Sequence, residues 1–332
     1  RLAAALAADP AVERIVGVDT RPPSNDDRVR LGRTEFVRAD IRNPLIARVI
    51  AQAKVDSVVH ASVTATPRGA GGRTSMKELN VIGTMQLLAA CQRAPGVRRL
   101  VVKSSSTVYG SSPKDPAMFT EDMAPRRLPR SGYGKDSVEV EGYVRGFARR
   151  RPDVTVTLLR CANLIGPRIE TALTRYFSLP VVPTVLGFDP RLQFCHEYDA
   201  LAVLELATID GNPGTFNVAG DGVLTLSQAV RRLGKPSVAV PPAVMAAIGS
   251  LFPRARAADI SAEQATFLAY GRGLDTTRLR QELGYHPQAT TSEAFDSFAA
   301  RLGPGALSPE RVAGIERQVS GLMSKAAAYA GR

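Results

Sequence analysis

The feature that most constrains the fold is a regular alternation of short apolar runs with longer amphipathic stretches. The apolar runs are rich in Val and Ile, as is typical of buried strands, and they occupy 14–19, 35–40, 55–61, 99–105 and 154–160. Stretches with helical spacing lie between them, at 43–54, 75–94 and 131–150. The sequence therefore predicts an α/β chain with a doubly wound parallel sheet and helices on both faces.

After about residue 165 the pattern loosens into Pro-rich turns, a short strand at 193–199 and a helix near 199–209. We interpret residues 1–165 as the doubly wound domain and 166–307 as a smaller α+β substrate-binding region that interleaves with it. The remaining 308–332 begin with Ser-Pro, which suits the start of a helix, and are predicted to form a C-terminal helix.

The first residues, "RLAAALAADPAVERIVGVD", read as a helix that leads into a strand. In dinucleotide-binding domains such a helix follows a first strand and a glycine-rich turn, whose backbone N–H groups hold a pyrophosphate. Neither feature precedes the helix here. We therefore expect this sequence to be a piece of a longer chain whose first strand and glycine-rich loop are missing.

The formal net charge is +12, with arginine clusters at 125–130 and 147–153. Such charge attracts nucleic acid, membrane phosphates or a phosphorylated small substrate, and it is also found on plain solvated surfaces. The clusters contain no interleaved aromatic residues, and no apolar run approaches the roughly 20 residues that span a bilayer. We expect a cytoplasmic protein with no nucleic-acid or membrane partner. The three cysteines are far apart, so neither a metal site nor a disulfide is expected.

Six short motifs occur in a recognisable order. They are "VDSVVHAS" (55–62), "NVIGT" (80–84), "SSSTVYG" (104–110), "YGK" (133–135), "LLRCANLIGP" (158–167) and "FCHEYDA" (194–200). Over roughly residues 1 to 300 the chain resembles the extended short-chain dehydrogenases/reductases of the NAD-dependent epimerase/dehydratase family, which includes UDP-glucose 4-epimerase. The resemblance implies a Rossmann-like fold, NAD as cofactor and a nucleotide sugar as substrate.

The resemblance also assigns a cofactor side. Seven residues fall at its positions: Asp19, Asp40, Ile41, His60, Ala61, Ser62 and Asn80. The first three are expected to hold the adenosine half, the segment 60–62 to pass along the cofactor with its backbone, and Asn80 to brace the neighbouring strand. Asp19 at a strand end would accept hydrogen bonds from a ribose diol and favour NAD over NADP. Arg21 weakens that preference. The His60 ring itself is better explained as a packed strand-end side chain than as a catalyst, because the family uses this segment mainly for backbone contact.

The resemblance further implies the catalytic and substrate side. Ser105 matches the hydroxyl that polarises the substrate, and Tyr133 matches the catalytic acid/base. Asn163 falls in a loop that touches the substrate in the family, and His196, with Asp199 beside it, matches a motif that pins the substrate domain; both Asn163 and His196 are predicted to bind substrate. A homodimer, formed through a helix bundle that includes 131–150, is also implied.

The chain departs from the family at one residue. A free tyrosine has a pKa near 10 and is a poor base near neutral pH. In the family a lysine four residues later lies on the same helical face and lowers this pKa, but here that residue is Ser137. Lys135 lies about 200° around the helix from Tyr133 and cannot replace it. Lys103, two residues before Ser105 on a strand, is a hypothetical substitute; alternatively, its amine leaves the sheet for solvent or a buried partner.

Two functions remain open at this stage. The first is an NAD-dependent epimerase or dehydratase that acts on a nucleotide sugar through transient hydride transfer. The second is a catalytically impaired NAD-binding protein with a regulatory or scaffolding role, for which Ser137 is the main support. The fold alone does not decide between them, because function lies in the site.

Overall fold

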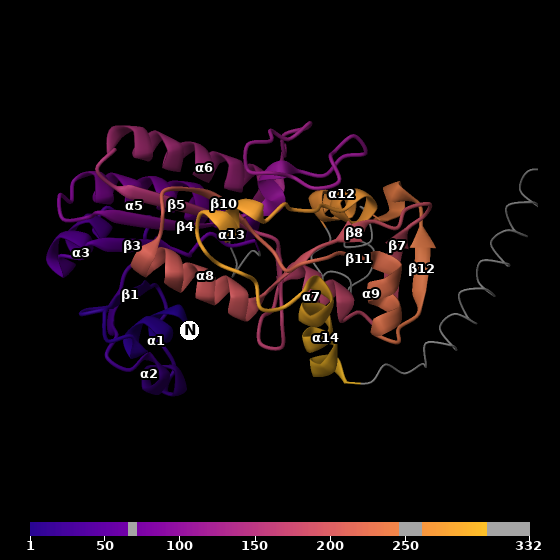
Figure 1. The fold of residues 1–332 in the computed structure, drawn as a ribbon, viewed down its shortest axis with the longest axis horizontal. Helices are drawn as coiled ribbons and strands as arrows, with labels where there is room; N and C mark the ends of the chain where they lie inside the picture. Colours follow the sequence, from indigo (N-terminus) through magenta and orange to yellow (C-terminus); the bar gives the residue numbers. More distant parts are fainter. Residues whose placement is uncertain (66–71, 246–260, 304–332) are drawn as a thin grey trace, which may run out of the picture.

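The computed structural model describes residues 1–65, 72–245 and 261–303, which fold around a parallel β-sheet (Figure 1). Four strands form this sheet in the order β10–β5–β4–β3, and all neighbours are parallel. They are β3 (Ser57–His60), β4 (Arg99–Ser105), β5 (Thr155–Cys161) and β10 (Gly214–Val218). The α/β class and the parallel sheet predicted from the alternation are confirmed.

The first two predicted strands form a pair of their own. β1 (Val16–Asp19) and β2 (Glu35–Arg38) are parallel, and β1 pairs with β2 alone among the described strands. α1 (Leu2–Ala8) precedes this pair and α2 (Asn25–Leu31) connects its strands. Thus β1 to β5 lie in two separate parallel sheets.

One face of the four-stranded sheet is covered by α3 (Ile46–Ala53), α5 (Gly83–Gln92) and α6 (Gly132–Arg150). α6 has buried Val140, Val144 and Phe147 at helical spacing, and these side chains pack into the core of this face. The predicted helix at 75–94 is observed as three consecutive parts. They are α4 (Gly72–Lys77), a π-helical turn η1 (Glu78–Ile82) and α5.

The opposite face is covered by α8 (Glu197–Asp210), which comes from the second half of the chain. α8 packs Val203 and Ala207 into a buried cluster that contains Phe216 of β10. α1 lies against α8 from the other side (Figure 1). Both β10 and α8 lie beyond residue 165, so the two halves of the chain share one core.

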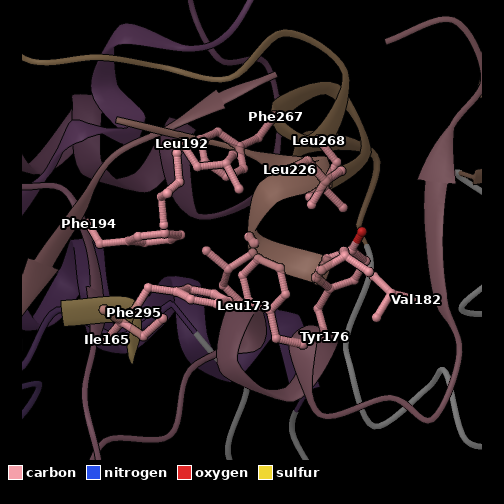
Figure 2. Close-up of a cluster of buried hydrophobic side chains, with 14 of the residues drawn as sticks. Ile165, Leu173, Tyr176, Val182, Leu192, Phe194, Leu226, Phe267, Leu268 and Phe295 are labelled. Atoms are coloured by element: carbon pink, nitrogen blue, oxygen red, sulfur yellow. The ribbon is translucent and has the colours of Figure 1, made fainter. Parts of the chain in front are cut away.

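The rest of the second half packs around a second core, rich in aromatic side chains (Figure 2). Phe194 and Phe295 stack there with ring centroids 5.6 Å apart, and Tyr176 lies in the same cluster. The remaining elements are η2 (Ser106–Tyr109), β6 (Asn163–Ile165), α7 (Ala172–Phe177), β7 (Val182–Val185), β8 (Arg191–Leu192), β9 (Phe194–His196), β11 (Leu224–Thr225), α9 (Leu226–Arg232), β12 (Ser237–Val240), α12 (Ala262–Tyr270), α13 (Thr277–Gln281) and α14 (Thr291–Leu302). The helix predicted at 308–332 lies outside the described residues.

Candidate active site

Ser105 is the last residue of β4 and therefore lies at the carboxyl edge of the main sheet. Its Oγ accepts the backbone N–H of Thr107 at 3.2 Å and so caps η2, the short helix that follows. This bond leaves the hydroxyl proton free, and the side chain is half-buried. Ser105 can therefore donate a hydrogen bond to a molecule bound at this edge.

Tyr133 lies in the first turn of α6, whose start reaches the same edge because the helix connects β4 back to β5. Gly132 before it has φ +69°, a conformation that glycine adopts at little cost. The Tyr133 ring packs partly buried against the core beneath α5 and α6. Within the described ranges its hydroxyl has no hydrogen-bond partner, so it is available to a ligand.

The start of α6 is held in place by Arg73 of α4. Its guanidinium binds both carboxylate oxygens of Asp136 at 2.5 and 2.6 Å and donates to the Gly132 carbonyl at 2.6 Å. Asp136 is fully buried, and it also accepts a hydrogen bond from Asn80 at 3.1 Å. The turn that carries Tyr133 is thus tied to α4 and η1 by an ion pair and two hydrogen bonds.

Ser137 is turned towards its own helix. Its Oγ donates to the carbonyl of Tyr133 at 2.9 Å, and the residue is 1% exposed. Lys135 lies 3.8 Å from Glu139 on the exposed side of α6. Neither residue brings a positive charge to the phenol.

Lys103 lies on β4, two residues before Ser105. Burial lowers its pKa, but Tyr133 and the two thiols Cys161 and Cys195 outweigh burial, so the net shift of the Lys103 pKa is upward. In the described part of the chain no hydrogen bond or salt bridge engages its ammonium. Lys103 is therefore a charged group at the edge where Ser105 and Tyr133 lie.

His60 is a packed side chain at the end of β3. Its Nε2 lies 2.7 Å from Thr84 Oγ1, which itself donates to the Asn80 carbonyl, so Nε2 carries the proton. Nδ1 then accepts from Ser62 Oγ at 3.0 Å. Burial, and secondarily the charge of Lys103, lower the pKa of His60 to about 4. The ring is therefore neutral and its two nitrogens are satisfied by the protein.

The other residues predicted on the cofactor side lie at strand ends or just after them. Asp19 is exposed at the end of β1, where one carboxylate oxygen accepts the N–H of Arg21 at 2.9 Å. Asp40 forms a salt bridge with Arg42 at 2.6 Å, which lowers the Asp40 pKa mainly through the hydrogen bond from that guanidinium. Ile41 packs close to Gly83 of α5, where an added Cβ would lie 2.7 Å from it.

Ala61 and Ser62 follow β3 and are exposed, which leaves their backbone open to a ligand. Asn80 is fully buried and braces the same loop. Its side-chain amide accepts from the N–H of Thr64 and donates to the carbonyl of Thr64, both at 2.9 Å. The loop after β3 is therefore held by the Asn80 side chain of η1.

The residues predicted to contact substrate lie farther along. Asn163 begins β6, is half-buried, and its side-chain amide has no hydrogen bond in the described ranges. His196 caps the start of α8, and its Nε2 lies 3.0 Å from Ser297 of α14. Asp199 accepts the Tyr285 hydroxyl at 2.7 Å and two backbone N–H groups. His196 and Asp199 thus join α8 to the C-terminal part of the described chain.

A hollow of about 200 Å³ lies between the segment 112–119 and residues 269–273, and two arginines line it. Arg191 is exposed there and no hydrogen bond or salt bridge engages its side chain in the described chain. Arg272 is buried and donates to three neutral oxygens, those of Gly110, Ser106 and Ser111. Burial lowers the Arg272 pKa to about 10, which leaves it charged at neutral pH.

Three residues that hold the segments of the candidate site in place were not identified from the sequence. Arg73 and Arg272 had no motif around them, and Glu263 of α12 contacts the start of α6 from 129 positions away. Its carboxylate accepts the N–H of Gly134 at 3.1 Å, and burial raises its pKa. Such contacts carry no local sequence signal, because the partners meet only after the chain has folded.

Arg160 of β5 pairs with the buried carboxylate of Glu141 at 2.8 Å. The described residues contain no cluster of three or more His, Cys, Asp or Glu side chains arranged to hold a metal ion. None of the described helices is both long and apolar enough to cross a bilayer. The three cysteines are buried free thiols.

Together the fold and these residues define a class: a Rossmann-like nucleotide-binding protein with a serine and a tyrosine at the carboxyl edge of its parallel sheet. The model of the NAD dependent epimerase/dehydratase family matches residues 1–219, and the chain belongs to that family. The resemblance stated from the sequence is therefore confirmed, as is NAD as the cofactor of the family.

The chain is also similar to other proteins in sequence and, in its fold, to solved structures. The "Uncharacterized protein Rv0501" of Mycobacterium tuberculosis is 51% identical over 98% of this chain and 86% of its own length. UDP-glucose 4-epimerase of Neisseria meningitidis serogroup C is 35% identical over 40% of this chain and 38% of its own. The structure of UDP-glucose 4-epimerase from Thermotoga maritima with UDP-glucose has a TM-score of 0.66 at 18% identity, over 91% of this chain and 95% of that one.

Proposed function

We propose that this protein is an NAD-dependent epimerase or dehydratase that acts on a nucleotide sugar through transient hydride transfer. The observation that carries the proposal is the placement of Ser105 and Tyr133 at one edge of the sheet, each with a hydroxyl proton that no described residue binds. Oxidation of a sugar hydroxyl needs a group that takes its proton and is helped by a hydrogen-bond donor to the same oxygen, and a tyrosine and a serine can fill these roles.

The described residues fit NAD at this edge. Ala61 and Ser62 are exposed directly after β3, and Asp19 is exposed at the end of β1, where a ribose diol would bind. When bound, NAD supplies the acceptor for the hydride that leaves the sugar carbon. The carboxylate of Asp40 is already paired with Arg42, so Asp40 would contact the adenosine half beside this salt bridge.

The work of the protein residues then follows from their positions. Tyr133 as phenolate takes the proton from the reacting sugar hydroxyl, and Ser105 donates a hydrogen bond to the same oxygen. Because α4 holds the start of α6 through Arg73 and Asp136, the phenol keeps its position between turnovers.

A diphosphate-linked substrate is supported by the two arginines of the hollow. Arg191 is exposed there and forms no salt bridge with a described carboxylate, so its guanidinium can reach a phosphate. The buried Arg272 adds positive charge to the same hollow. Neighbouring solved structures contain UDP-glucose and, in the 4-epimerase of Bacillus cereus, UDP-glucuronic acid. Asn163, at the start of β6, offers a free amide to the sugar.

The alternative function is a catalytically impaired NAD-binding protein with a regulatory or scaffolding role. It is favoured by Ser137, which gives its hydroxyl to the backbone and leaves the family's lysine position without charge. The two proposals differ in one outcome, the conversion of a sugar.

The test is to incubate the full-length protein with NAD and nucleotide sugars and to follow the sugar signals by nuclear magnetic resonance. We expect one sugar to be converted, and Tyr133→Phe to lose at least about 100-fold of that rate, as for removal of a general acid/base. Tyr143→Phe, on the same helix but exposed, is the matched control. Conversion that survives Tyr133→Phe would contradict the assigned role, and no conversion of any sugar would favour the alternative.

A further inference from the structure

Helix α12 and the residues just after it bond to both segments that carry the candidate catalytic hydroxyls. Near the start of α12, the Glu263 carboxylate accepts the N–H of Gly134, the residue after Tyr133, at 3.1 Å. Just past the end of α12, Arg272 donates at 3.1 Å to the hydroxyl of the residue that follows Ser105. One helix from the second half of the chain is therefore bonded directly beside both hydroxyls.

The Arg272 end of this connection is fixed to several parts of the chain. The backbone N–H of Arg272 donates to the carbonyl of Arg191 in β8 at 3.2 Å. Its guanidinium lies over the Phe267 ring of α12, 5.3 Å from the ring centroid, and donates to the Gly110 carbonyl at 2.7 Å. The end of α12 is thus held against the segment that follows β4, and it gives a fixed base for the contact of Glu263 with α6.

The Glu263 carboxylate occupies space that two glycines leave free. Gly132 and Gly134 flank Tyr133, and a Cβ added to either glycine would overlap with an oxygen of this carboxylate. Gly134 does not have a positive φ, so its backbone conformation does not require glycine, and alanine is more favourable inside a helix. The close approach of the carboxylate is therefore the main reason for a glycine at position 134.

The same carboxylate supplies a cap that α6 lacks at its own start. Ser131 stands at the N-cap position but its side chain makes no capping hydrogen bond, so the first N–H groups of α6 need another acceptor. Glu263 accepts from Gly134 and, when ionised, brings a negative charge to the positive end of a 19-residue helix. Its second oxygen, Oε1, has no hydrogen-bond partner among the described residues. The bond to Gly134 is thus how Glu263 holds the turn that carries Tyr133.

We propose that Glu263 is a positioning residue for Tyr133: by capping α6 from α12, it holds the phenol at a fixed place relative to Ser105. This inference deepens the proposed function and rests on it. In this role Glu263 does not touch the substrate, exchanges no proton and forms no covalent bond. Its loss should therefore slow the chemical step and leave the binding of NAD and sugar largely as it is.

The first test measures the capped amide itself, without NAD or sugar. Hydrogen exchange is followed by nuclear magnetic resonance in protein labelled with isotopic glycine, and the Gly134 signal is assigned by its absence in Gly134→Ala. We expect this amide to exchange at least about 10-fold faster in Glu263→Ala, because its acceptor is lost and the turn opens locally. The amide of Gly142, farther along α6, is the internal control and should keep its rate. A loss of global stability alone would speed up both amides.

The second test uses the shape of the contact. In the wild type, Gly134→Ala should lower the melting temperature by about 2–4 °C, because the new Cβ displaces the carboxylate. In Glu263→Ala the same substitution should cost clearly less, with a remainder from Pro129, whose Cβ lies 3.0 Å from the added Cβ. Gly142→Ala is the matched control, because nothing lies within 4 Å of its added Cβ, and it should have the same effect in both backgrounds.

Where a sugar is converted, kinetics separate positioning from stability. Glu263→Ala should lower kcat by at least about 10-fold and change the KM of the sugar by less than about twofold, as expected when a reacting group loses its position but the binding contacts remain. Glu263→Gln keeps an oxygen that can accept the Gly134 N–H and should recover most of the wild-type kcat. Thr266→Ala, on the exposed side of α12, is the control and should leave kcat unchanged.

The outcomes separate this inference from the proposed function. Unchanged exchange of the Gly134 amide in Glu263→Ala overturns the cap, whether or not sugars are converted. Faster exchange, with no sugar converted by the wild type, supports the cap and counts against the proposed function. A wild-type kcat in Glu263→Ala, despite faster exchange, overturns the positioning role. If Glu263→Ala does not fold, Glu263→Met, which fills the space without an acceptor, takes its place in every comparison.

Discussion

Arg73 and Asp136 join α4 to the first turn of the helix that carries Tyr133. The guanidinium meets both carboxylate oxygens, and Asp136 is completely buried whereas the Arg73 side chain is 39% exposed. The pair therefore holds the turn that carries Tyr133 against α4. In the sequence, the region of α4 was recognised as helical only by the spacing of its apolar residues.

Removal of Arg73 should leave a buried carboxylate with Asn80 alone. We expect Arg73→Met to lower the free energy of unfolding by about 1–3 kcal/mol, the usual cost of an unsatisfied buried polar group. Adding Asp136→Asn should recover part of this loss, since the two residues are coupled. Urea denaturation of the two single variants and the double variant measures these free energies of unfolding. If the loss in the double variant equals the sum of the two single losses, the coupling is contradicted. Arg42→Met, at a more exposed pair, is the control.

A second buried ion pair joins the same helix, α6, to β5. Arg160 of β5 binds Glu141 through two bonds of 3.0 and 2.8 Å, and Ser104 donates to the same carboxylate at 2.7 Å. Glu141→Gln should cost about 3–5 kcal/mol of folding free energy, because it leaves the Arg160 charge buried and unpaired.

Glu139→Gln, two residues earlier on α6, is the matched control for this change, since its partner Lys135 is exposed. We expect it to cost less than about 1 kcal/mol, as exposed ion pairs do. Thermal unfolding of both variants compares them. Equal melting temperatures would show that the Glu141 pair contributes no more than a surface pair.

The pH dependence of stability should carry a contribution from His60. Its pKa falls from the ordinary 6.5 to about 4 on folding, so the neutral ring favours the fold fully above about pH 6.5. This contribution is lost as the pH falls from 6.5 towards 4, by on the order of 3 kcal/mol. His60→Gln should lack that slope when unfolding is measured between pH 7 and pH 4, and His286→Gln, at an exposed site, should keep it. A wild-type slope in His60→Gln would be contrary to this account.

The implied homodimer points to the outer surface of α5 and α6. Met85 is 45% exposed and Tyr143 39% exposed, and both line a shallow hollow between these helices. We expect a second copy of the chain to cover this surface, and Met85→Glu to convert a dimer into a monomer in light scattering. Val29→Glu, at an exposed site on α2, should not change the mass. A wild-type mass of one chain would remove this expectation.

Much of the fold could be predicted because its elements are locally encoded. The strand predicted at 99–105 is observed with those bounds, and the helix predicted at 131–150 begins one residue later. The strand contains a short apolar run that is buried on both faces, and the helix has buried apolar residues at helical spacing. The strand predicted at 193–199 is shorter, because His196 caps a helix that starts at Glu197.

The site was only partly accessible from the sequence. Ser105, Tyr133 and the absence of lysine at 137 follow from motif positions, and so did the hypothesis for Lys103. Arg73 and Glu263 did not, because their contacts with α6 join residues 59 and 129 positions apart. Such contacts depend on the packing of α4 and α12, which no local pattern describes.

The central claim is that hydride transfer occurs at the edge formed by Ser105 and Tyr133 despite Ser137. The most direct measurement loads the full-length protein with NAD, adds UDP-, GDP- and dTDP-linked sugars in turn, and follows the near-ultraviolet band of reduced nicotinamide. We predict that the band appears with one of these sugars and is absent in Tyr133→Phe. Binding of NAD without the band or a converted sugar, across the whole panel, would contradict the claim and favour a binding protein.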